Sequence, residues 1–571
     1  MGRHTIVTMK NFKNLFIISS LFIFSSVCFS QSVSQFEILK KKYPGQSSVI
    51  TNDVENILID VDANSYKITQ EVTKQTMILK NPTNYLVTDK VFSSHFIKLL
   101  EVDAKTLLPN GNKYKVEKVE KFTDQKNSSD YVFYDEVVAK SFIFPSVQPG
   151  AITSVRYVQE LIDPHMLGSF FFKWHVPCEF SQLSIKADKK ARLKYKLFNT
   201  ESANIEFKQE EKGKYNIYTW TAKNINAADF ESDAPNIKFY YPHIAFYIEN
   251  TIPNDVSNES SGLNSLYNYY YNLIKTINTT DDKNIQQEVD KVIAGATSEE
   301  EKVKKLYYWV QDNITYVAFE DGMQGYIPDQ ASQVFVKRYG DCKGMSSLLS
   351  YMLKLAGINS YLTWIGTRDI PYKYTEIPSK VTDNHMIVTY YNNQKPIFLD
   401  ATNNHLIYGL PSSMIQGKQA LVSIGEKEYK IEEVPVIGKN MNLISDSTYF
   451  YISNQNLEGT GSMIFTGYEK NHQTYYLDGK DNKQTKEHLL GILLKGNNKF
   501  FLDTFHIENL YDREKPLDIS YKFRLSDYFN EIDNEIYINL NLNKAYNNLE
   551  YDVVKRKVPV EGNNSHIYKT I

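Results

Sequence analysis

The sequence is poor in cysteine and shows no metal-binding pattern. Of its 571 residues only three are cysteine, and these stand far apart as Cys28, Cys178 and Cys342. It has no CxxC pair and no dense group of histidines, the closely spaced ligands from which most zinc sites are built. We therefore expect neither a metal site nor another cofactor.

An excess of charge is also missing. The 64 lysines and arginines are nearly balanced by 67 aspartates and glutamates, which gives a formal net charge of −3 at pH 7. Nucleic-acid-binding chains usually carry a basic surplus, so no nucleic-acid partner is expected. Internal repeats and low-complexity linkers are absent as well. A chain of this length is too long for one hydrophobic core, and about three domains are expected.

Long apolar runs are absent except near the N-terminus. There Lys13 precedes an apolar stretch from Leu15 to Phe29, and Ser30 offers a small residue for cleavage. This pattern is typical of a secretory signal peptide, and the stretch is short for a membrane-spanning helix. We predict a signal peptide over residues 1–30, cleavage near Ser30, export to the periplasm or beyond the cell, and no transmembrane segment in the mature chain.

Two details of this N-terminus leave alternatives. Met9 is a second possible start, because the signal would then begin directly with its basic residues. Cys28 stands where a lipid-anchored cysteine could be suspected, but bulky Val27 precedes it where such cleavage sites prefer a small residue. A soluble exported protein is therefore favoured over a lipoprotein.

The remaining chain divides by the period of its apolar residues. Residues 35–245 contain short alternating runs such as Tyr66–Val72, separated by turn residues, and predict an N-terminal β-sandwich domain. Residues 257–415 begin with three helical patterns, Leu263–Ile277, Ile285–Ile293 and Val303–Ile314. Residues 435–571 return to β patterns and predict a C-terminal β-sandwich-like domain. A helix is expected over residues 485–494, with residues 480–484 before it as a loop. The predicted fold class is α+β.

One cysteine lies in a pattern that predicts chemistry. Cys342 follows Gly340-Asp341 and opens a helical pattern that stops at Gly357. Downstream, His385 opens a strand-like run, and Asp400 ends the next one. A turn at Asn392-Asn393 between the two runs predicts an antiparallel hairpin that can bring His385 and Asp400 side by side. Such a thiol, imidazole and carboxylate are the parts of a nucleophilic triad.

The pattern also offers the means to activate the thiol. A helix N-terminus and a nearby imidazole both stabilise a thiolate, and unpaired N–H groups there can stabilise an oxyanion. The simpler alternatives are a disulfide between Cys342 and Cys178, or a buried cysteine, a packed histidine and a turn aspartate without a shared role. Cys178 is interpreted as a small buried apolar residue. The order and flanks of Cys342, His385 and Asp400 favour the triad.

These residues resemble a known family. The runs Tyr339–Gly344, Asn384-His385 and Leu399–Thr402 are similar to the transglutaminase-like branch of the papain-fold superfamily. The β-region before them, with its Phe144–Ala151 signature, resembles the uncharacterised N-terminal domain that accompanies such secreted proteins in Bacteroidota. The resemblance implies a papain-like transglutaminase fold for the central domain.

The same resemblance assigns roles to the three residues. It implies Cys342 as nucleophile, His385 as base and acid, and Asp400 as the group that orients the imidazole. The side chain that completes the oxyanion site is chosen among Tyr326, Gln324 and Gln330, and we favour Tyr326.

The sequence thus predicts an exported, thiol-dependent acyl-transfer enzyme acting on protein or peptide amide bonds in the cell envelope. Hydrolysis is favoured over crosslinking, because water competes wherever no amine site exists. The alternative is a non-catalytic envelope binding or assembly module with a vestigial triad, since the fold alone permits binding without turnover. A carbohydrate-active protein has little support, because no close carboxylate pair stands out. The substrate and the oligomeric state do not follow from the sequence.

Overall fold

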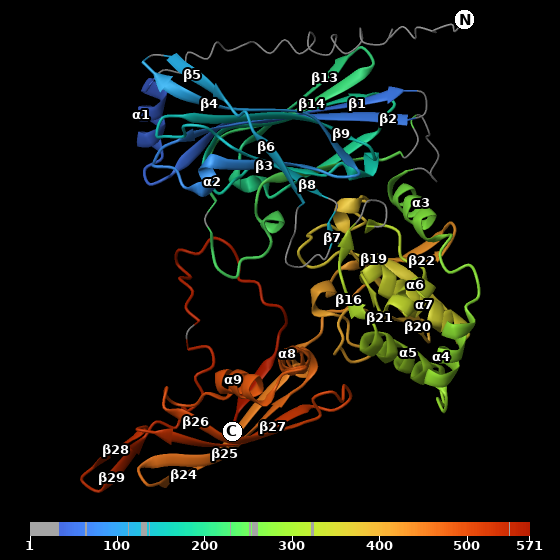
Figure 1. Ribbon diagram of the computed structural model, residues 1–571, viewed down its shortest axis with the longest axis vertical. Helices are drawn as coiled ribbons and strands as arrows, with labels where there is room; N and C mark the ends of the chain where they lie inside the picture. The colour runs from blue at the N-terminus through green and yellow to red at the C-terminus, as the bar shows by residue number, and fades with distance from the viewer. Residues whose placement is uncertain are drawn as a thin grey trace, which may run out of the picture.

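A computed structural model gives the structure of residues 33–62, 65–111, 113–126, 134–135, 137–228, 230–250, 253, 261–320, 325–547 and 549–571. The predicted signal peptide, with Met9 and Cys28, lies outside these residues. The described chain forms three bodies: an N-terminal β-rich body, a central body of helices and strands, and a C-terminal sheet with two helices (Figure 1). Among the described residues, no helix combines the length and the apolar character needed to span a membrane.

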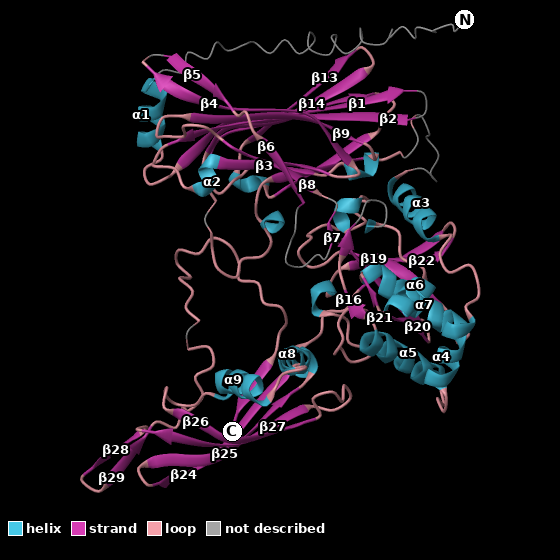
Figure 2. Cartoon of the chain, viewed as in Figure 1, coloured by secondary structure: helices cyan, strands magenta, loops and turns pink. Residues whose placement is uncertain are grey.

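The N-terminal body is built almost entirely of strands (Figure 2). Its helices are α1 (Val33–Lys42) and α2 (Asn84–Val87). Its strands are β1 (Ser48–Asp62), β2 (Ser65–Ile78), β3 (Thr88–Ser93), β4 (Ile97–Asn110), β5 (Lys113–Lys118), β6 (Phe122–Lys126), β7 (Tyr134–Asp135), β8 (Val138–Ile143), β9 (Ile152–Leu161), β10 (Ser169–Phe171), β11 (Cys178–Asp188), β12 (Leu193–Phe198), β13 (Ile205–Lys212), β14 (Tyr215–Ile225) and β15 (His243–Ile248).

These strands form a layered β structure, as predicted. An eight-stranded sheet in the order β13-β14-β11-β1-β2-β9-β4-β5 is covered by two three-stranded sheets, β10-β15-β12 and β3-β8-β6. Buried Leu183 and Trp220 of the large sheet pack with Phe246 of the first small sheet. At the other end, Val155 packs with Phe142 of the second small sheet. Alternating side chains thus bury one face of each sheet in a shared core.

The central body combines a helical layer with a five-stranded antiparallel sheet in the order β21-β20-β19-β22-β23. The three predicted helices at its start are confirmed, and helix α7 packs against β19 and β20 through its apolar face. The elements are α3 (Gly262–Ile274), α4 (Lys283–Ile293), α5 (Glu299–Asn313), β16 (Thr315–Tyr316), β17 (Phe319–Glu320), α6 (Ala331–Lys337), β18 (Tyr339–Gly340), α7 (Cys342–Leu355), β19 (Ser360–Ile365), β20 (His385–Asn392), β21 (Lys395–Leu399), β22 (Gln419–Gly425) and β23 (Glu428–Glu433).

The C-terminal body has a five-stranded sheet in the order β26-β27-β25-β24-β30. Its elements are β24 (Leu443–Ser453), β25 (Asn456–Phe465), α8 (Gly467–Leu477), α9 (Asn482–Leu493), β26 (Phe500–Glu508), β27 (Leu517–Ser526), β28 (Phe529–Ile532), β29 (Glu535–Ile538) and β30 (Ile567–Thr570). Two helices supply its second layer, because Leu477 of α8 and Leu489 and Leu493 of α9 join the core of the sheet. In this domain, which was predicted to be β-sandwich-like, helices therefore cover the five-stranded sheet in place of a second sheet.

One prediction in this region is wrong. Residues 480–484 were expected to be a loop, but α9 begins at Asn482. Asp481 accepts a hydrogen bond from the Gln484 N–H, and the Gln484 side chain accepts one from the Asp481 N–H. This reciprocal capping box stabilises a helix start inside a polar run, where apolar periodicity gives no indication of it.

The α+β class is confirmed, and the three bodies are in contact. β7 pairs with β17 in parallel, which joins the N-terminal body to the central one. The segment before β30 returns to the N-terminal body, where Tyr551 Oη donates to Asp233 at 3.0 Å and Arg556 lies 3.5 Å from Glu231. The limits of the three domains stay predictions.

Candidate active site

Cys342 is the first residue of α7. The preceding Asp341 caps this helix, because its Oδ1 accepts a hydrogen bond of 2.8 Å from the Gly344 N–H. Glycine stands on both sides of the cysteine, where there is little room for a side chain. A Cβ at Gly340 or at Gly344 would lie 3.2 Å from a methyl group of Val334 in α6, a tight contact that Val334 would have to relieve by moving. The run Gly340–Gly344 therefore fits α6 closely against the helix start that carries the thiol.

The imidazole and the carboxylate come from one hairpin, as predicted. His385 opens β20, and Asp400 directly follows β21, the antiparallel partner of β20. Asn393 and Gln394, both left-handed with φ of 49° and 68°, form the two-residue turn between the strands, one residue later than the predicted Asn392-Asn393. At the open end of the hairpin, His385 Nε2 lies 3.1 Å from Asp400 Oδ2.

Asp400 is fully buried and surrounded by donors. Its Oδ2 also accepts a 2.6 Å hydrogen bond from Ser412 Oγ, and its Oδ1 accepts from Thr402 through both the hydroxyl, at 2.7 Å, and the N–H, at 3.2 Å. Burial alone would raise the pKa of Asp400. The charge and hydrogen bond of His385, together with the hydrogen bonds of Ser412 and Thr402, lower this pKa to about 2. The carboxylate is therefore held ionised beside the imidazole.

The thiol and the same imidazole line one cleft, with Cys342 at the start of α7 and His385 at the start of β20. Because Nε2 faces Asp400, Nδ1 is the nitrogen left for the sulfur. Burial raises the pKa of Cys342, yet the charge of Lys343 and the contact with His385 outweigh it and lower the pKa below its ordinary 9.0. Burial likewise lowers the pKa of His385, but Asp400 and the thiol raise it to about 10. The arrangement favours a thiolate–imidazolium pair.

The thiol and imidazole line a cleft of about 480 Å³ between the central and N-terminal bodies. The N-terminal body supplies one wall, which includes Phe96, His165 and Met166. His165 Nδ1 lies 2.7 Å from Asp163 Oδ1, and the His165 ring stacks on Tyr269 at 3.9 Å between centroids. A cleft of this size is within the range of small-molecule and peptide side-chain sites.

The three residues considered for the oxyanion site lie in different places. Tyr326 lines the cleft with Cys342, and its hydroxyl is 3.7 Å from Met166 Sδ. Gln330 caps α6, and its Oε1 accepts a 2.7 Å hydrogen bond from the Asn278 N–H. Gln324 lies outside the described residues. A role of Tyr326 as oxyanion donor stays a prediction, and the Cys342 N–H, which has no acceptor within its own helix, is the nearest backbone donor.

Sequence reasoning missed four residues around the triad. Thr402 lies in the Asp-Ala-Thr run that was singled out, and a threonine two residues after an aspartate is a recognisable local partner. Ser412 and Lys380 give no local indication of their place, and His165 comes from another domain. Each of these three reaches the site only through the tertiary fold.

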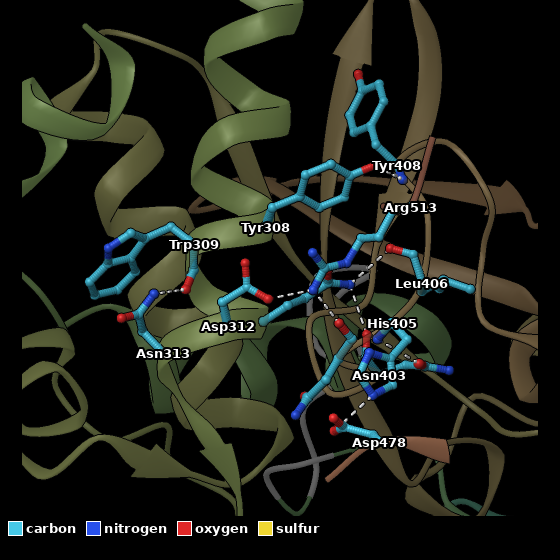
Figure 3. Close-up of polar contacts among 12 residues, drawn as sticks. Tyr308, Trp309, Asp312, Asn313, Asn403, His405, Leu406, Tyr408, Asp478 and Arg513 are labelled. Atoms are coloured by element: carbon cyan, nitrogen blue, oxygen red, sulfur yellow. Dashed lines mark hydrogen bonds and ion pairs between the residues drawn. The ribbon is translucent and has the colours of Figure 1, made fainter. Parts of the chain in front are cut away.

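The loop between Asp400 and Ser412 is held from two sides. Gln311 of α5 donates from Nε2 to the Asn403 carbonyl at 2.7 Å and to the Leu406 carbonyl at 3.1 Å. From the C-terminal body, Arg513 Nη2 donates to Asp312 Oδ1 at 2.5 Å and also to the Asn404 carbonyl (Figure 3).

Tyrosines add to this support. Tyr308 Oη accepts from the Tyr408 N–H at 2.9 Å (Figure 3), and Tyr468 Oη of α8 donates to the Pro411 carbonyl at 2.6 Å. The last contact lies next to Ser412, a donor to Asp400.

The two cysteines outside the N-terminal segment are not joined. Cys178 is buried in β11, its Sγ lies 3.4 Å from the Phe180 carbonyl, and burial raises its pKa to about 12. The prediction of a small buried residue at this position is confirmed. Within the described ranges, no group of three or more His, Cys, Asp or Glu side chains has a geometry that could hold a metal ion.

Comparisons with known proteins agree with this architecture. Residues 84–229 match a domain of unknown function, DUF3857, and residues 286–400 match the transglutaminase-like superfamily. No curated protein matches the sequence at a significant level. The crystal structure of a candidate protease from Parabacteroides distasonis ATCC 8503 aligns with a TM-score of 0.54 and 12% identity, over 87% of this chain and 95% of that one. At this identity the likeness concerns the fold.

A second solved structure, a candidate cysteine protease from Cytophaga hutchinsonii, aligns over 60% of this chain and 78% of its own at 10% identity. Its TM-score of 0.17 is too low to support an argument. The family predicted from the motifs is thus confirmed by the two matched regions. The chain thus joins a transglutaminase-like domain, matched over residues 286–400, to an N-terminal DUF3857 domain, matched over residues 84–229.

Proposed function

We propose that the protein is a thiol-dependent acyl-transfer enzyme that cleaves amide bonds in proteins or peptides. Cys342 is the nucleophile, His385 the base and acid, and Asp400 the residue that orients the imidazole. The observation that carries the proposal is the placement of Cys342 and His385 in the lining of one cleft, with Asp400 Oδ2 3.1 Å from His385 Nε2. A thiol, an imidazole and a carboxylate in this arrangement are the parts of a nucleophilic catalytic triad.

The geometry supports a two-step reaction. The Cys342 thiolate attacks the amide carbonyl carbon, and backbone N–H groups at the start of α7 stabilise the oxyanion. The His385 imidazolium gives its proton to the amide nitrogen, the C–N bond breaks, and a thioester remains. Neutral His385 then takes a proton from water, the resulting hydroxide attacks the thioester, and the acid leaves as the thiol is restored.

Water is the proposed acceptor in preference to an amine. Any thioester at Cys342 is exposed to water entering the cleft, whereas transfer to an amine needs a site that holds the amine. We also propose that the protein is exported by its N-terminal signal peptide. Its substrate would then be a protein or peptide of the cell envelope.

The first prediction concerns labelling of the nucleophile. Iodoacetamide at neutral pH is expected to alkylate the wild-type protein at Cys342, because a thiolate reacts and a thiol does not. Mass spectrometry of the intact chain and of its peptides measures the site and the extent. Cys342→Ala is expected to abolish labelling. Cys178→Ala serves as the matched control and is expected to leave it unchanged, since Cys178 is buried with a raised pKa.

Two results would count against the proposal. Labelling that persists in Cys342→Ala, or a reduced wild-type protein that does not react, would show that Cys342 is not an activated nucleophile. Turnover is tested separately by exposing envelope proteins to the wild type and to Cys342→Ala and comparing new termini and crosslinks. A reactive thiol without any difference between the two samples would favour the alternative, a binding module with an unused triad.

A further inference from the structure

Lys380 places an ammonium group in the wall of the cleft that contains Cys342. It opens the 3₁₀ turn Lys380–Thr382, five residues before His385 in the chain. Its Nζ lies 3.1 Å from the ring centroid of Tyr326, 5.4 Å from that of Tyr269 and 5.7 Å from that of Phe96. Met166 Sδ lies 4.0 Å away. Three aromatic rings and a thioether from two domains therefore surround the cation.

The nearby carboxylates are turned to other donors. Asp163 accepts from His165 and, at 2.9 Å, from Tyr269 Oη. Asp383 accepts from Tyr270 Oη at 2.6 Å and from Tyr374 Oη at 2.8 Å. In the part of the chain that the structure describes, no carboxylate lies within ion-pairing distance of Lys380.

The other basic side chains that line the cleft each have an acidic partner. Lys343 is paired with Asp341, His165 with Asp163, and His385 with Asp400. Lys380 differs from them, and burial lowers its pKa to about 8, against the weaker opposing effect of Asp163 and Asp383. Keeping a partly buried ammonium without an anion is unfavourable, and cation–π contacts offset only part of the cost. An apolar side chain would fill the same space without it.

We propose that Lys380 forms an anion subsite that binds a carboxylate of the peptide substrate and makes the cleft selective for acidic peptides. The inference rests on the proposed function for its substrate class. The ammonium can donate three hydrogen bonds, and a charge-assisted bond to a carboxylate is the strongest use of them in a desolvated site. The carboxylate comes either from a Glu or Asp side chain or from the C-terminus of the peptide.

The test measures binding in the full chain carrying Cys342→Ala, so that no turnover interferes. Four acetylated tetrapeptide amides move one Glu through an alanine chain, and four matched peptides carry Gln instead. A third set carries Gln with a free C-terminal carboxylate. Isothermal titration gives the Kd of each peptide for this protein, and again after Lys380→Gln, Lys380→Arg or Lys430→Gln. Lys430 is the matched control, an exposed lysine over the Tyr391 ring of the same domain.

At least one carboxylate peptide is expected to bind about tenfold or more tightly than its neutral counterpart, as a charge-assisted hydrogen bond implies. Lys380→Gln is expected to remove this preference, whereas Lys380→Arg and Lys430→Gln keep it. A gain confined to Glu peptides assigns the subsite to a side chain, and a gain confined to free termini assigns it to the peptide end.

Equal binding of all three sets by the Cys342→Ala chain would overturn the inference without any substitution at Lys380. A preference that survives Lys380→Gln in a chain with an unchanged circular dichroism spectrum would also overturn it, and would leave Lys380 as a contact between domains. The proposed function fails separately, through the absence of iodoacetamide labelling at Cys342.

Discussion

At the residue scale, the site depends on a carboxylate that the fold keeps charged. Asp400 is fully buried, yet four hydrogen bonds from His385, Ser412 and Thr402 favour its ionised form. That charge raises the pKa of His385, and the protonated imidazole in turn favours the Cys342 thiolate. The pKa of the Cys342 thiol therefore depends on Asp400, a carboxylate that lies on the opposite side of the imidazole ring.

A further prediction concerns how the alkylation rate of Cys342 depends on pH when the charge of Asp400 is removed. In the wild type, alkylation of Cys342 by iodoacetamide is expected to stay fast well below pH 9, because the thiol pKa is lowered. In Asp400→Asn the imidazolium loses its counter-ion, so the pKa of His385 falls and that of Cys342 rises. Alkylation at pH 6 should then drop by about tenfold or more, a change of one pKa unit in the thiol.

The two proteins should converge at the alkaline end of the profile, once both sulfurs are thiolates. The pH profile of the alkylation rate measures this. Asp478→Asn is the matched control, since it removes the carboxylate of another His–Asp pair, 3.3 Å from His405 and away from the cleft. Superimposable profiles for the wild type and Asp400→Asn would refute the argument.

At the scale of elements, the loop that follows β21 has no regular structure and needs partners for its carbonyls. Gln311 of α5 supplies two of them from a side chain that is 1% exposed. Helix α5 is amphipathic, and its sequence alone does not explain why a glutamine stands on the buried face. In the structure, Gln311 satisfies backbone carbonyls of the loop that follows Asp400.

Gln311→Ala is expected to loosen this loop. Two buried carbonyls would lose their donor, a cost of about 1–3 kcal/mol. Hydrogen–deuterium exchange of residues 401–411 should accelerate accordingly, while the strands β19 and β20 keep their protection. Gln286→Ala is the matched control, because Gln286 is a half-buried glutamine of α4 whose side chain donates to Asp290 on the same helix, away from this loop. Unchanged exchange in the loop would show that Gln311 is dispensable.

At the scale of the whole molecule, the active-site region lies where the three bodies meet. The N-terminal body supplies a wall of the cleft, and the C-terminal body contacts the loop behind Asp400. Arg513 makes several of the contacts between the C-terminal and central bodies. It donates to Asp312 and to the Asn404 carbonyl, and its guanidinium lies 4.8 Å from the Tyr308 ring centroid.

Arg513→Ala is expected to weaken docking of the C-terminal body without unfolding it. The loss should be about 1.5–3 kcal/mol, the value of a hydrogen bond to a charged group. Hydrogen–deuterium exchange should accelerate in residues 304–312 and 509–516. Arg524→Ala removes an ion pair to Asp503 within the C-terminal sheet and is the matched control, with no change expected in those residues. Equal effects of the two substitutions would contradict a docking role.

Local features of the sequence accounted for much of the site. The helix start at Cys342 was predicted because capping and helical periodicity act over a few residues, and the hairpin joining His385 to Asp400 because it closes through a two-residue turn. The start of α9 was missed because a capping box lies inside a polar run. A helix over residues 485–494 was predicted, but α8 was not, and apolar periodicity did not indicate that the two helices cover the sheet.

The sequence by itself determined the α+β class, the order of the elements and the three residues of the proposed triad, since these depend on hydrogen-bonding and apolar patterns between neighbours in the chain. Only the tertiary structure decided that Ser412 donates to Asp400, that Phe96 and Met166 reach the cleft, and that Lys380 faces it with no acidic partner among the residues described. Such contacts arise when whole faces of distant elements pack together, and no short stretch of sequence encodes which faces meet.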